Sequence, residues 1–222
     1  MTEALLTSGW DQTNGRVDRH LPSSYRQRLN WTKHARTLST MRDAYDSVTV
    51  RPAELADMPA IGALRRLVAR ETYSAYDPQH VADWADERHS DQWIAAEFDG
   101  PHDSLMLAAV SGSGHVVGTA YAQRKPSSHH ADSYFGGLYL HRHARRKGIG
   151  TGLLTGCLRW LASRGASRVA CEAAHDNTPA LRALHAAGFV ERDRKPFAPI
   201  AGLLWVELVA PLDAHQPTRM VA

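Results

Sequence analysis

Short apolar runs separated by turn residues predict β-strands in the first half of the region that follows residue 46. Residues 48–50 form one run, and residues 105–110 and 115–121 form two more. The last two runs flank a Ser-Gly-Ser-Gly segment at residues 111–114, a composition typical of a hairpin turn. The pattern therefore predicts an opening strand and, further along the chain, a β-hairpin.

Apolar residues at helical spacing predict helices between the opening strand and the hairpin. Ile61, Leu64 and Leu67 recur three residues apart after Asp57, whose carboxylate suits the N-cap of a helix. Residues 78–98 are predicted to be helical throughout, with a few apolar side chains among many charges.

The clearest helix lies in the second half of the chain. Its apolar residues occur at i, i+1, i+4, i+5 and i+8 and form one stripe that would face a sheet. The stripe consists of Leu153, Leu154, Cys157, Leu158 and Leu161. Gly165 ends the helix, and residues 168–174 predict the next strand.

A basic turn with two glycines connects the apolar run at residues 138–140 to this helix. Gly148 and Gly150 let the backbone turn tightly and approach a ligand without a Cβ. The first amides of the helix have no intrahelical partner and, together with the helix dipole, favour an anion. Further positive charge at the same place comes from Arg145, Arg146 and Lys147. The turn therefore predicts a site for a pyrophosphate.

Two familiar phosphate motifs do not fit this turn. A dinucleotide fingerprint needs G-x-G-x-x-G, whereas the run here is G-I-G-T-G, with the third glycine one place early. A P-loop needs a lysine directly after its second glycine, and Thr151 follows Gly150 here. The pyrophosphate site is therefore of another kind.

The turn resembles the coenzyme A signature of the GNAT acetyltransferase superfamily, R-x-x-G-x-G, in the form Arg145-x-x-Gly148-x-Gly150. The strand and turn at residues 48–57, the hairpin at 105–121, and the asparagine, short helix and Gly-Phe of residues 177–189 follow the family's order and spacing. The resemblance covers roughly residues 46–212. It implies an α/β (α+β) GNAT fold, in which helices flank a mixed, mostly antiparallel central sheet that is splayed at the CoA site.

The same resemblance implies that acetyl-CoA is the acyl donor and that no metal takes part. The pyrophosphate would lie on the basic turn, and the acetyl carbonyl and pantetheine arm would lie on the backbone of Leu138 and Leu140. Asn177 would contact the same arm. The implied cofactor-binding residues are Leu138, Tyr139, Leu140, Arg145, Arg146, Lys147, Gly148, Ile149, Gly150, Thr151 and Asn177.

The chemistry implied by the resemblance is direct acyl transfer through a tetrahedral intermediate. A neutral amine attacks the thioester, a base takes its proton, a backbone amide stabilises the oxyanion, and an acid protonates the departing thiolate. The sequence departs from the family at two positions: residues 134–137 contain no glutamate, and Leu184 stands where many relatives have a tyrosine. The remaining candidates are Glu172, Tyr134 and His185, and a structural role is an equal alternative for each.

In this family the segment between the first helix and the second strand usually lines the acceptor site. An aromatic wall for the acceptor would be formed by Tyr73, Tyr76 and Trp84, together with Trp93. Ordinary core packing is the alternative for each of them. The acidic residues Asp83, Asp86 and Glu87 of this segment either attract a cationic amine or form a solvated helix face.

Three functions stay open at this point. The first is N-acetylation of the amine of a small molecule, such as an antibiotic or another specialised metabolite. The second is acetylation of protein N-termini or lysine side chains by the same fold. The third is an acyl-CoA-binding module whose chemistry has decayed, which is consistent with the missing glutamate and tyrosine.

The histidines do not predict a metal site. His141 and His143 are two residues apart, and His129 and His130 lie in a nearby loop. A metal would need a third, convergent ligand, which the sequence does not identify. We interpret these histidines as surface residues.

The composition is that of a globular protein. The 222 residues are 43% hydrophobic and 22% charged, with a formal net charge of +3. The small charge and the lack of a basic helix or Cys/His finger argue against nucleic-acid binding, and no apolar run reaches the length of a membrane span. We expect no secretory signal, and two isolated cysteines favour a reduced, cytoplasmic location.

The chain divides at about residue 46. We expect a polar N-terminal extension at residues 1–45, an N-acetyltransferase domain at residues 46–213 and a C-terminal tail at residues 214–222. The extension is either a partly disordered tail or an arm that packs through its tryptophans, Trp10 and Trp31. Such an arm would lie on the domain or on a second copy of the chain in a homodimer.

Overall fold

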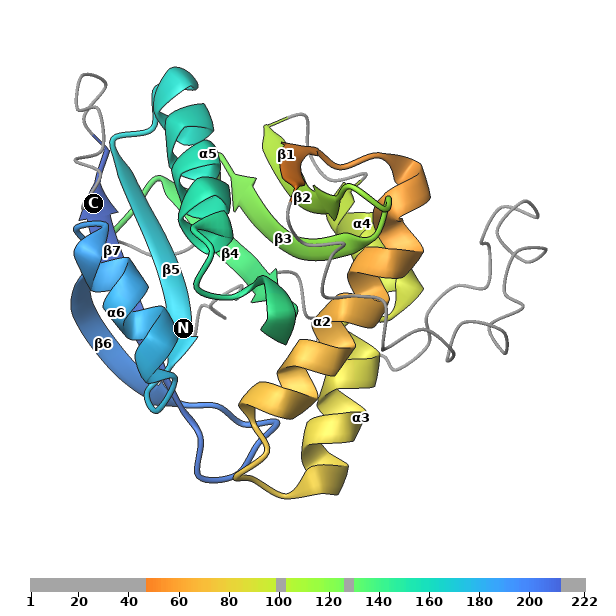
Figure 1. Cartoon of the computed structure of the whole chain (residues 1–222). Helices are drawn as coiled ribbons and strands as arrows, with labels where there is room; N and C mark the ends of the chain where they lie inside the picture. The colour runs from red at the N-terminus through yellow and green to blue at the C-terminus, as the bar shows by residue number, and fades with distance from the viewer. Residues whose placement is uncertain (1–46, 99–102, 126–129, 213–222) are drawn as a thin grey trace.

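A seven-stranded sheet runs through the centre of the computed structural model, which describes residues 47–98, 103–125 and 130–212 (Figure 1). The strands are β1 (Val48–Pro52), β2 (Ser104–Ser111), β3 (Val116–Gln123), β4 (Ser133–Leu140), β5 (Arg168–Ala174), β6 (Val190–Pro196) and β7 (Leu204–Pro211). Their order is β1-β2-β3-β4-β5-β7-β6, and the neighbours are antiparallel except for β4 and β5. This is the mixed, mostly antiparallel sheet that the sequence predicts. The expected extension and tail lie outside the described residues.

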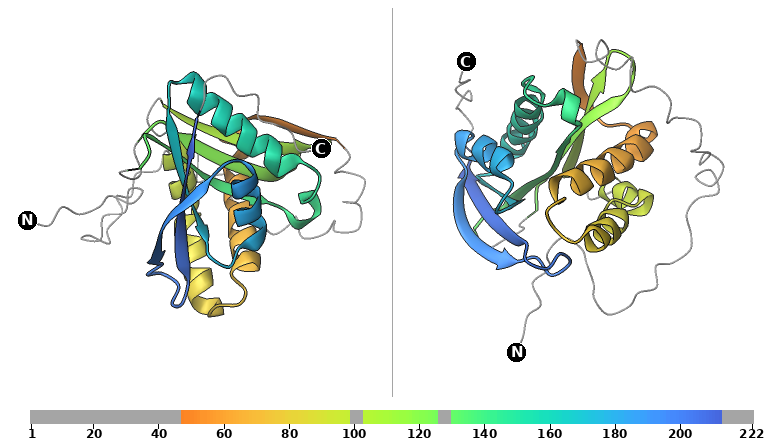
Figure 2. Two further views of the ribbon diagram at one scale, coloured as in Figure 1. Left: turned by 90° about the vertical axis from the view of Figure 1, so that its left-hand side faces the viewer. Right: turned by 60° about the horizontal axis from the view of Figure 1, so that its bottom comes forward.

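Helices cover both faces of this sheet (Figure 2). The α-helices are α2 (Met58–Thr72), α3 (Pro78–Arg88), α4 (Asp91–Phe98), α5 (Ile149–Ser163) and α6 (Thr178–Ala186), and the short 3-10 helices are η3 (Leu55–Asp57) and η4 (Arg142–Ala144). Helices α5 and α6 lie on one face, and α2, α3 and α4 lie on the other. The predicted stripe of α5 is confirmed, because Leu153, Leu154, Cys157 and Leu161 are buried and Leu158 packs against the same core. On the other face, Ile61 of α2 and Ile94 of α4 pack against Met106 of β2.

Strands β4 and β5 are parallel neighbours that pair only where they begin. Ser133 pairs with Val169, and Tyr134 pairs with Ala170. Beyond these two pairs the strands diverge toward their carboxyl ends (Figure 1). Because the strands no longer pair there, backbone polar groups along both edges are available to a ligand. The predicted splay between these strands is therefore present.

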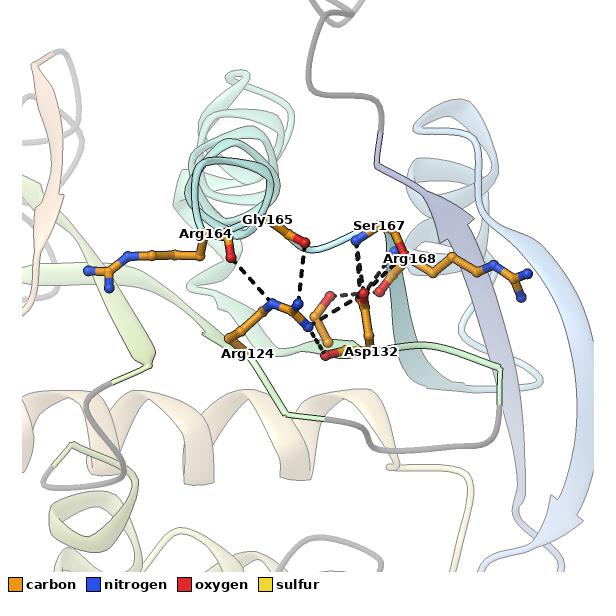
Figure 3. Close-up of polar contacts among 7 residues, drawn as sticks. Arg124, Asp132, Arg164, Gly165, Ser167 and Arg168 are labelled. Carbon is orange, nitrogen blue, oxygen red and sulfur yellow. Dashed lines mark hydrogen bonds and ion pairs between the residues drawn. The ribbon is translucent and has the colours of Figure 1, made fainter.

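Asp132 joins the two halves of the sheet at the closed end of the splay (Figure 3). Its carboxylate accepts hydrogen bonds from the Ser167 amide at 3.0 Å and from the Arg168 amide at 3.2 Å. Burial alone would raise the pKa of this carboxyl, but the amide and hydroxyl hydrogen bonds outweigh it and lower the pKa. Beside it, Arg124 donates to the carbonyl of Asp132 at 2.8 Å and to that of Gly165 at 3.2 Å. The start of β4 is thereby fixed to the turn that precedes β5.

The prediction of continuous helix over residues 78–98 is wrong, because the segment is broken at His89 and Ser90 between α3 and α4. His89 ends α3, and its carbonyl accepts a hydrogen bond from the Arg66 guanidinium of α2. The Ser90 hydroxyl accepts a hydrogen bond from the Trp93 amide at 3.4 Å and so helps to begin α4. The break is therefore held by a contact with another helix, which periodicity does not reveal.

Asp57 lies at the predicted N-cap position of α2 but makes no side-chain capping bond to that helix. Its carboxylate instead accepts from the Glu54 amide at 2.8 Å and pairs with Arg51 at 2.7 Å. It therefore closes the capping box of the short η3 helix that precedes α2.

Candidate active site

A bulge interrupts β4 within the splay. Thr119 of β3 pairs with Tyr139, whereas Tyr121 pairs with Gly136, so Gly137 and Leu138 together face a single residue of β3. Gly137 has a φ of +60°, a left-handed conformation that glycine adopts without strain. Such bulges bend a strand and leave backbone groups without a ladder partner. The apolar end of β4 therefore offers free backbone groups at the mouth of the splay.

The basic turn that follows β4 has left-handed residues at Arg146, with φ of +64°, and at Gly148, with φ of +76°. Gly148 is the N-cap of α5 and gives that helix no side-chain cap. The amides of Ile149, Gly150 and Thr151 therefore lack an acceptor within the helix and point out of its N-terminus. These amides lie where the sequence predicts an anion site, which stays a prediction.

The two glycines of the motif meet different surroundings. A Cβ added at Gly148 would meet nothing within 4 Å, so its left-handed backbone is what requires glycine. A Cβ added at Gly150 would lie 2.9 Å from Cδ1 of Leu140, so this glycine lets α5 pack closely on β4. One glycine shapes the turn, and the other brings the helix to the strand.

Arg145 links the turn to two other elements. Its Nε donates to the Leu140 carbonyl at 3.1 Å, and its Nη2 donates to Glu71 of α2 at 3.0 Å. This side chain therefore holds the turn against the end of β4, although Arg145, like Arg146 and Lys147, is exposed.

The remaining predicted cofactor residues lie along both edges of the splay. Leu138 and Leu140 pack on the α5 side of β4, and Tyr139 packs on the opposite side. On the β5 side, Asn177 is the N-cap of α6, and its side-chain oxygen accepts from the Ala180 amide at 3.3 Å.

Tyr134 and Glu172 come from the two strands that form the splay. Tyr134 lies in the last β4–β5 pair, opposite Ala170, and Glu172 follows two residues later on the same face of β5. The Tyr134 ring runs along β4, because a Cβ added at Gly136 would lie 2.5 Å from the tyrosine hydroxyl. Burial raises the pKa of Tyr134, and the nearby charge of Glu172 raises it further. The phenol is therefore protonated at neutral pH. Glu172 itself pairs with Lys195 of β6 at 2.7 Å.

The described contacts of His185 are with residues other than Tyr134 and Glu172. Its Nδ1 lies 3.0 Å from the Phe189 carbonyl, and its Nε2 lies 3.9 Å from a carboxylate oxygen of Glu191. The preceding Leu184 is buried in the core below α6. The contacts described for His185 thus connect α6 to β6 and do not include Tyr134 or Glu172.

The three predicted acceptor-site aromatics lie in one cluster. The rings of Tyr73 and Trp84 meet edge to face at 5.4 Å, and Tyr76 packs against the same core. The Tyr76 hydroxyl donates to Asp176 at 2.6 Å, and burial followed by this hydrogen bond raises the pKa of Tyr76 to about 12. Tyr139 of β4 also packs on this cluster, which therefore reaches the mouth of the splay.

Sequence reasoning missed the far side of this cluster. Phe197 lies 5.6 Å from the Trp84 ring and 4.9 Å from the Trp205 ring, centroid to centroid. These residues come from the β6–β7 connection and from β7, which no local motif links to α3. Trp93 lies apart, under the guanidinium of Arg88 at 4.7 Å.

A buried group of charges under β4 was also missed. Arg65 of α2 is 1% exposed and pairs with Glu97 of α4, which also pairs with Arg88 at 2.9 Å. The Tyr139 hydroxyl lies 3.1 Å from Nε2 of His89, beside the same group. The sequence carries one signal for it, since Arg65 falls four residues after Ile61, within the apolar stripe of α2.

The remaining polar candidates have ordinary surroundings. Asp86 pairs with Arg70 at 2.6 Å on exposed helix faces, and the His141 and His143 rings lie 5.3 Å apart. Within residues 47–98, 103–125 and 130–212, no three His, Cys, Asp or Glu side chains converge as metal ligands would, while His129 lies outside these ranges. None of the described helices is both long and apolar enough to cross a bilayer.

Several proteins of known structure share this fold. The sequence profile of the acetyltransferase (GNAT) family matches residues 69–189, whereas no curated protein matches the chain. The PaiA N-acetyltransferase of Thermoplasma acidophilum, solved in complex with coenzyme A, is 17% identical with a TM-score of 0.61, over 74% of this chain and 99% of that chain. A GCN5-related N-acetyltransferase from Kribbella flavida is 25% identical with a TM-score of 0.56, over 74% and 98%. The ribosomal-protein-S18-alanine N-acetyltransferase of Escherichia coli is 17% identical with a TM-score of 0.57, over 77% and 97%. The chain belongs to the GNAT family of acetyltransferases and is therefore an acyltransferase.

Proposed function

We propose that this acetyltransferase moves the acetyl group of acetyl-CoA directly onto the amine of a small molecule. The observation that carries the proposal is the splay of β4 from β5 directly beside a glycine-containing basic turn at a helix N-terminus. A GNAT enzyme needs both features: a charged end for the pyrophosphate and an open strand edge for the pantetheine arm. A structural neighbour solved with coenzyme A supports the same donor.

The donor would bind along the splay. Its pyrophosphate would accept hydrogen bonds from the amides of Ile149, Gly150 and Thr151 and would face the exposed side chains of Arg146 and Lys147. The pantetheine amides would pair with the edge of β4 at Leu138 and Leu140, in the manner of an added strand, beside the Arg145 guanidinium that donates to the Leu140 carbonyl. Asn177 would contact the arm from the β5 side.

The reaction would take place between Tyr134 and Glu172. The amine nitrogen forms a bond to the acetyl carbon, and the C–S bond breaks when the tetrahedral intermediate collapses. Glu172, directly or through water, takes the proton that the amine loses. Tyr134 gives its proton to the departing thiolate, a role that Leu184 cannot perform. The negative charge on the intermediate would be stabilised by a backbone amide of the β4 bulge.

The acceptor would enter beside the aromatic cluster of Tyr73, Tyr76 and Trp84. These rings supply flat apolar surface for the body of a small molecule, and the Tyr76–Asp176 pair adds polar groups at its edge. A protein N-terminus is the second candidate acceptor, because one structural neighbour is an alanine N-acetyltransferase of a ribosomal protein.

Thiol release from acetyl-CoA tests the proposal directly. Wild-type protein is assayed with a panel of small primary amines and with short peptides that have free N-termini. We expect the highest kcat/KM with a small amine. Faster turnover of the peptides would favour the protein acceptor, and CoA binding without any turnover would indicate a binding module in place of an enzyme.

A further inference from the structure

Arg65 is a buried cation, and three of the five N–H donors of its guanidinium have no partner among the described residues. Its Nη1 donates to the Glu97 carboxylate, but its Nε and Nη2 are buried and have no hydrogen-bond partner among the described residues. Burying unsatisfied donors of a charged group destabilises a fold. A methionine, although shorter, would occupy much of the same space without this penalty. The cost of Arg65 therefore calls for a role other than packing.

The group around Arg65 also carries excess positive charge. Arg65 and Arg88 share one carboxylate, that of Glu97, so two positive charges face one negative charge. Burial, followed by the charges of Arg65 and Arg88, lowers the pKa of His89 to about 2. His89 is therefore neutral, and Arg65, Arg88 and Glu97 together keep a net charge of about +1, with the Arg65 guanidinium buried and Arg88 partly exposed.

This charge lies directly under the β4 bulge. A Cβ added at Gly137 would be 2.9 Å from Nη2 and 3.3 Å from Cζ of Arg65, so the guanidinium packs against the backbone of that residue. The guanidinium also lies 5.7 Å from the centre of the Tyr139 ring, on the side of β4 away from α5. The excess charge therefore adjoins the one segment of β4 that departs from regular pairing.

We propose that Arg65 is a positioning residue for acyl transfer, whose buried charge makes the β4 bulge favour a negative group at the acyl position. The inference rests on the proposed function, in which the acyl carbonyl lies on this part of β4. Its oxygen becomes an oxyanion when the amine adds to the carbon, and the field of Arg65 favours that charged state over the neutral thioester. Arg65 does not touch the donor and acts through the backbone of Gly137 and Leu138.

The proposed role of Arg65 can be tested without an acceptor by comparing two coenzyme A thioethers of nearly equal size. S-carboxymethyl-CoA places a carboxylate at the acyl position, and S-carbamoylmethyl-CoA places a neutral amide there. We expect the affinity ratio of the charged to the neutral analogue, measured by calorimetry, to fall about tenfold or more in Arg65→Met. The affinity of the neutral analogue should stay within about threefold of wild type. Arg65→Lys, which keeps the charge, should retain most of the ratio.

Arg70→Met is the matched control, since Arg70 lies on the same helix in an exposed pair with Asp86, and its ratio should equal that of wild type. Arg65→Met leaves Glu97 paired with Arg88 and should keep a cooperative thermal transition near that of wild type. If it does not fold, Arg65→Gln keeps a donor to Glu97, removes the charge and should show the same fall. An unchanged ratio in a folded uncharged variant overturns the proposal. Wild-type protein that binds neither analogue would instead contradict the proposed function.

Discussion

At the scale of single residues, the two glycines of the basic turn are required for different structural reasons. Gly148 is needed for a left-handed backbone in open space, whereas Gly150 is needed for contact between α5 and Leu140. From the sequence, both glycines are expected to let the backbone turn tightly and approach a ligand without a Cβ. The structure supports the tight turn at Gly148 and gives a packing reason at Gly150.

Gly148→Asp should abolish CoA binding while leaving most of the stability in place. Aspartate and asparagine tolerate the left-handed region better than other side chains, but aspartate adds a negative charge where the phosphates would lie. Gly148→Asn is the control, because it has the same shape without the charge and should retain part of the CoA affinity. Calorimetry measures the CoA affinity of both variants, and thermal unfolding measures their stability. Equal CoA affinities for the two variants would contradict the phosphate assignment.

Arg146 and Lys147 should act on the phosphates alone. Replacing both with alanine should weaken CoA binding. The loss for each contact should be below about 1.5–3 kcal/mol, because both side chains are exposed. Pantetheine, which has no pyrophosphate, should bind as it does to wild type. Parallel calorimetric titrations check this, and an equal loss for both ligands would mean that the two side chains have another role.

At the scale of elements, β4 brings together most of the proposed site. Its first residues pair with β5 and hold Tyr134, its middle forms the bulge at Gly137, and its end leads into the basic turn. A single strand therefore aligns the proposed acid, the acyl position and the phosphate site along one line, which suits a long and narrow donor.

Tyr134→Phe should lower kcat by about 10²-fold and leave CoA affinity unchanged, because it removes only the proton that the thiolate would receive. His185→Ala should leave kcat at the wild-type level, since the contacts of His185 are with Phe189 and Glu191. Steady-state kinetics with the best amine of the panel compares the two. The reverse order of effects would transfer the role of acid to His185.

The elements that sequence could predict are those whose signals are local. The α5 stripe, the hairpin and the glycine turn each depend on residues within a few positions of one another. The break at His89 depends on Arg66 of another helix, and the β4 bulge depends on the register with β3. Arg65 was visible as a charge in an apolar stripe, but its partner Glu97 and its place under Gly137 follow from tertiary packing.

At the scale of the whole molecule, the buried charges couple stability to pH. His89 is 3% exposed, and its pKa is lowered to about 2 by burial and by the neighbouring arginines. In the unfolded chain a histidine titrates near its ordinary value of about 6.5. Between these two values the unfolded state binds a proton that the folded state does not, so stability rises with pH in this window and is level above it.

The free energy of unfolding should therefore fall by up to about 1.4 kcal/mol for each pH unit below about 6.5 on account of His89. His89→Gln keeps a hydrogen-bond partner for the Tyr139 hydroxyl and removes the titration, so its stability should change less between pH 7.5 and 5.5. Urea unfolding at these two pH values measures the difference, with exposed His80→Gln as the control. A slope in His89→Gln as steep as that of wild type would show that other groups carry the acid sensitivity.

The hydrogen bonds of Asp132 join the two parts of the sheet where β4 and β5 begin. One part is the sheet from β1 to β4, the other is the sheet from β5 to β7, and in the described chain β4 and β5 share two residue pairs beside Asp132. Because β4 and β5 pair only beside Asp132, a change in the angle between the two strands there would alter their separation most at Leu140 and Ala174. The angle between β4 and β5 is therefore held at the closed end by the hydrogen bonds of Asp132, and at the open end the Tyr76–Asp176 hydrogen bond also links the two sides.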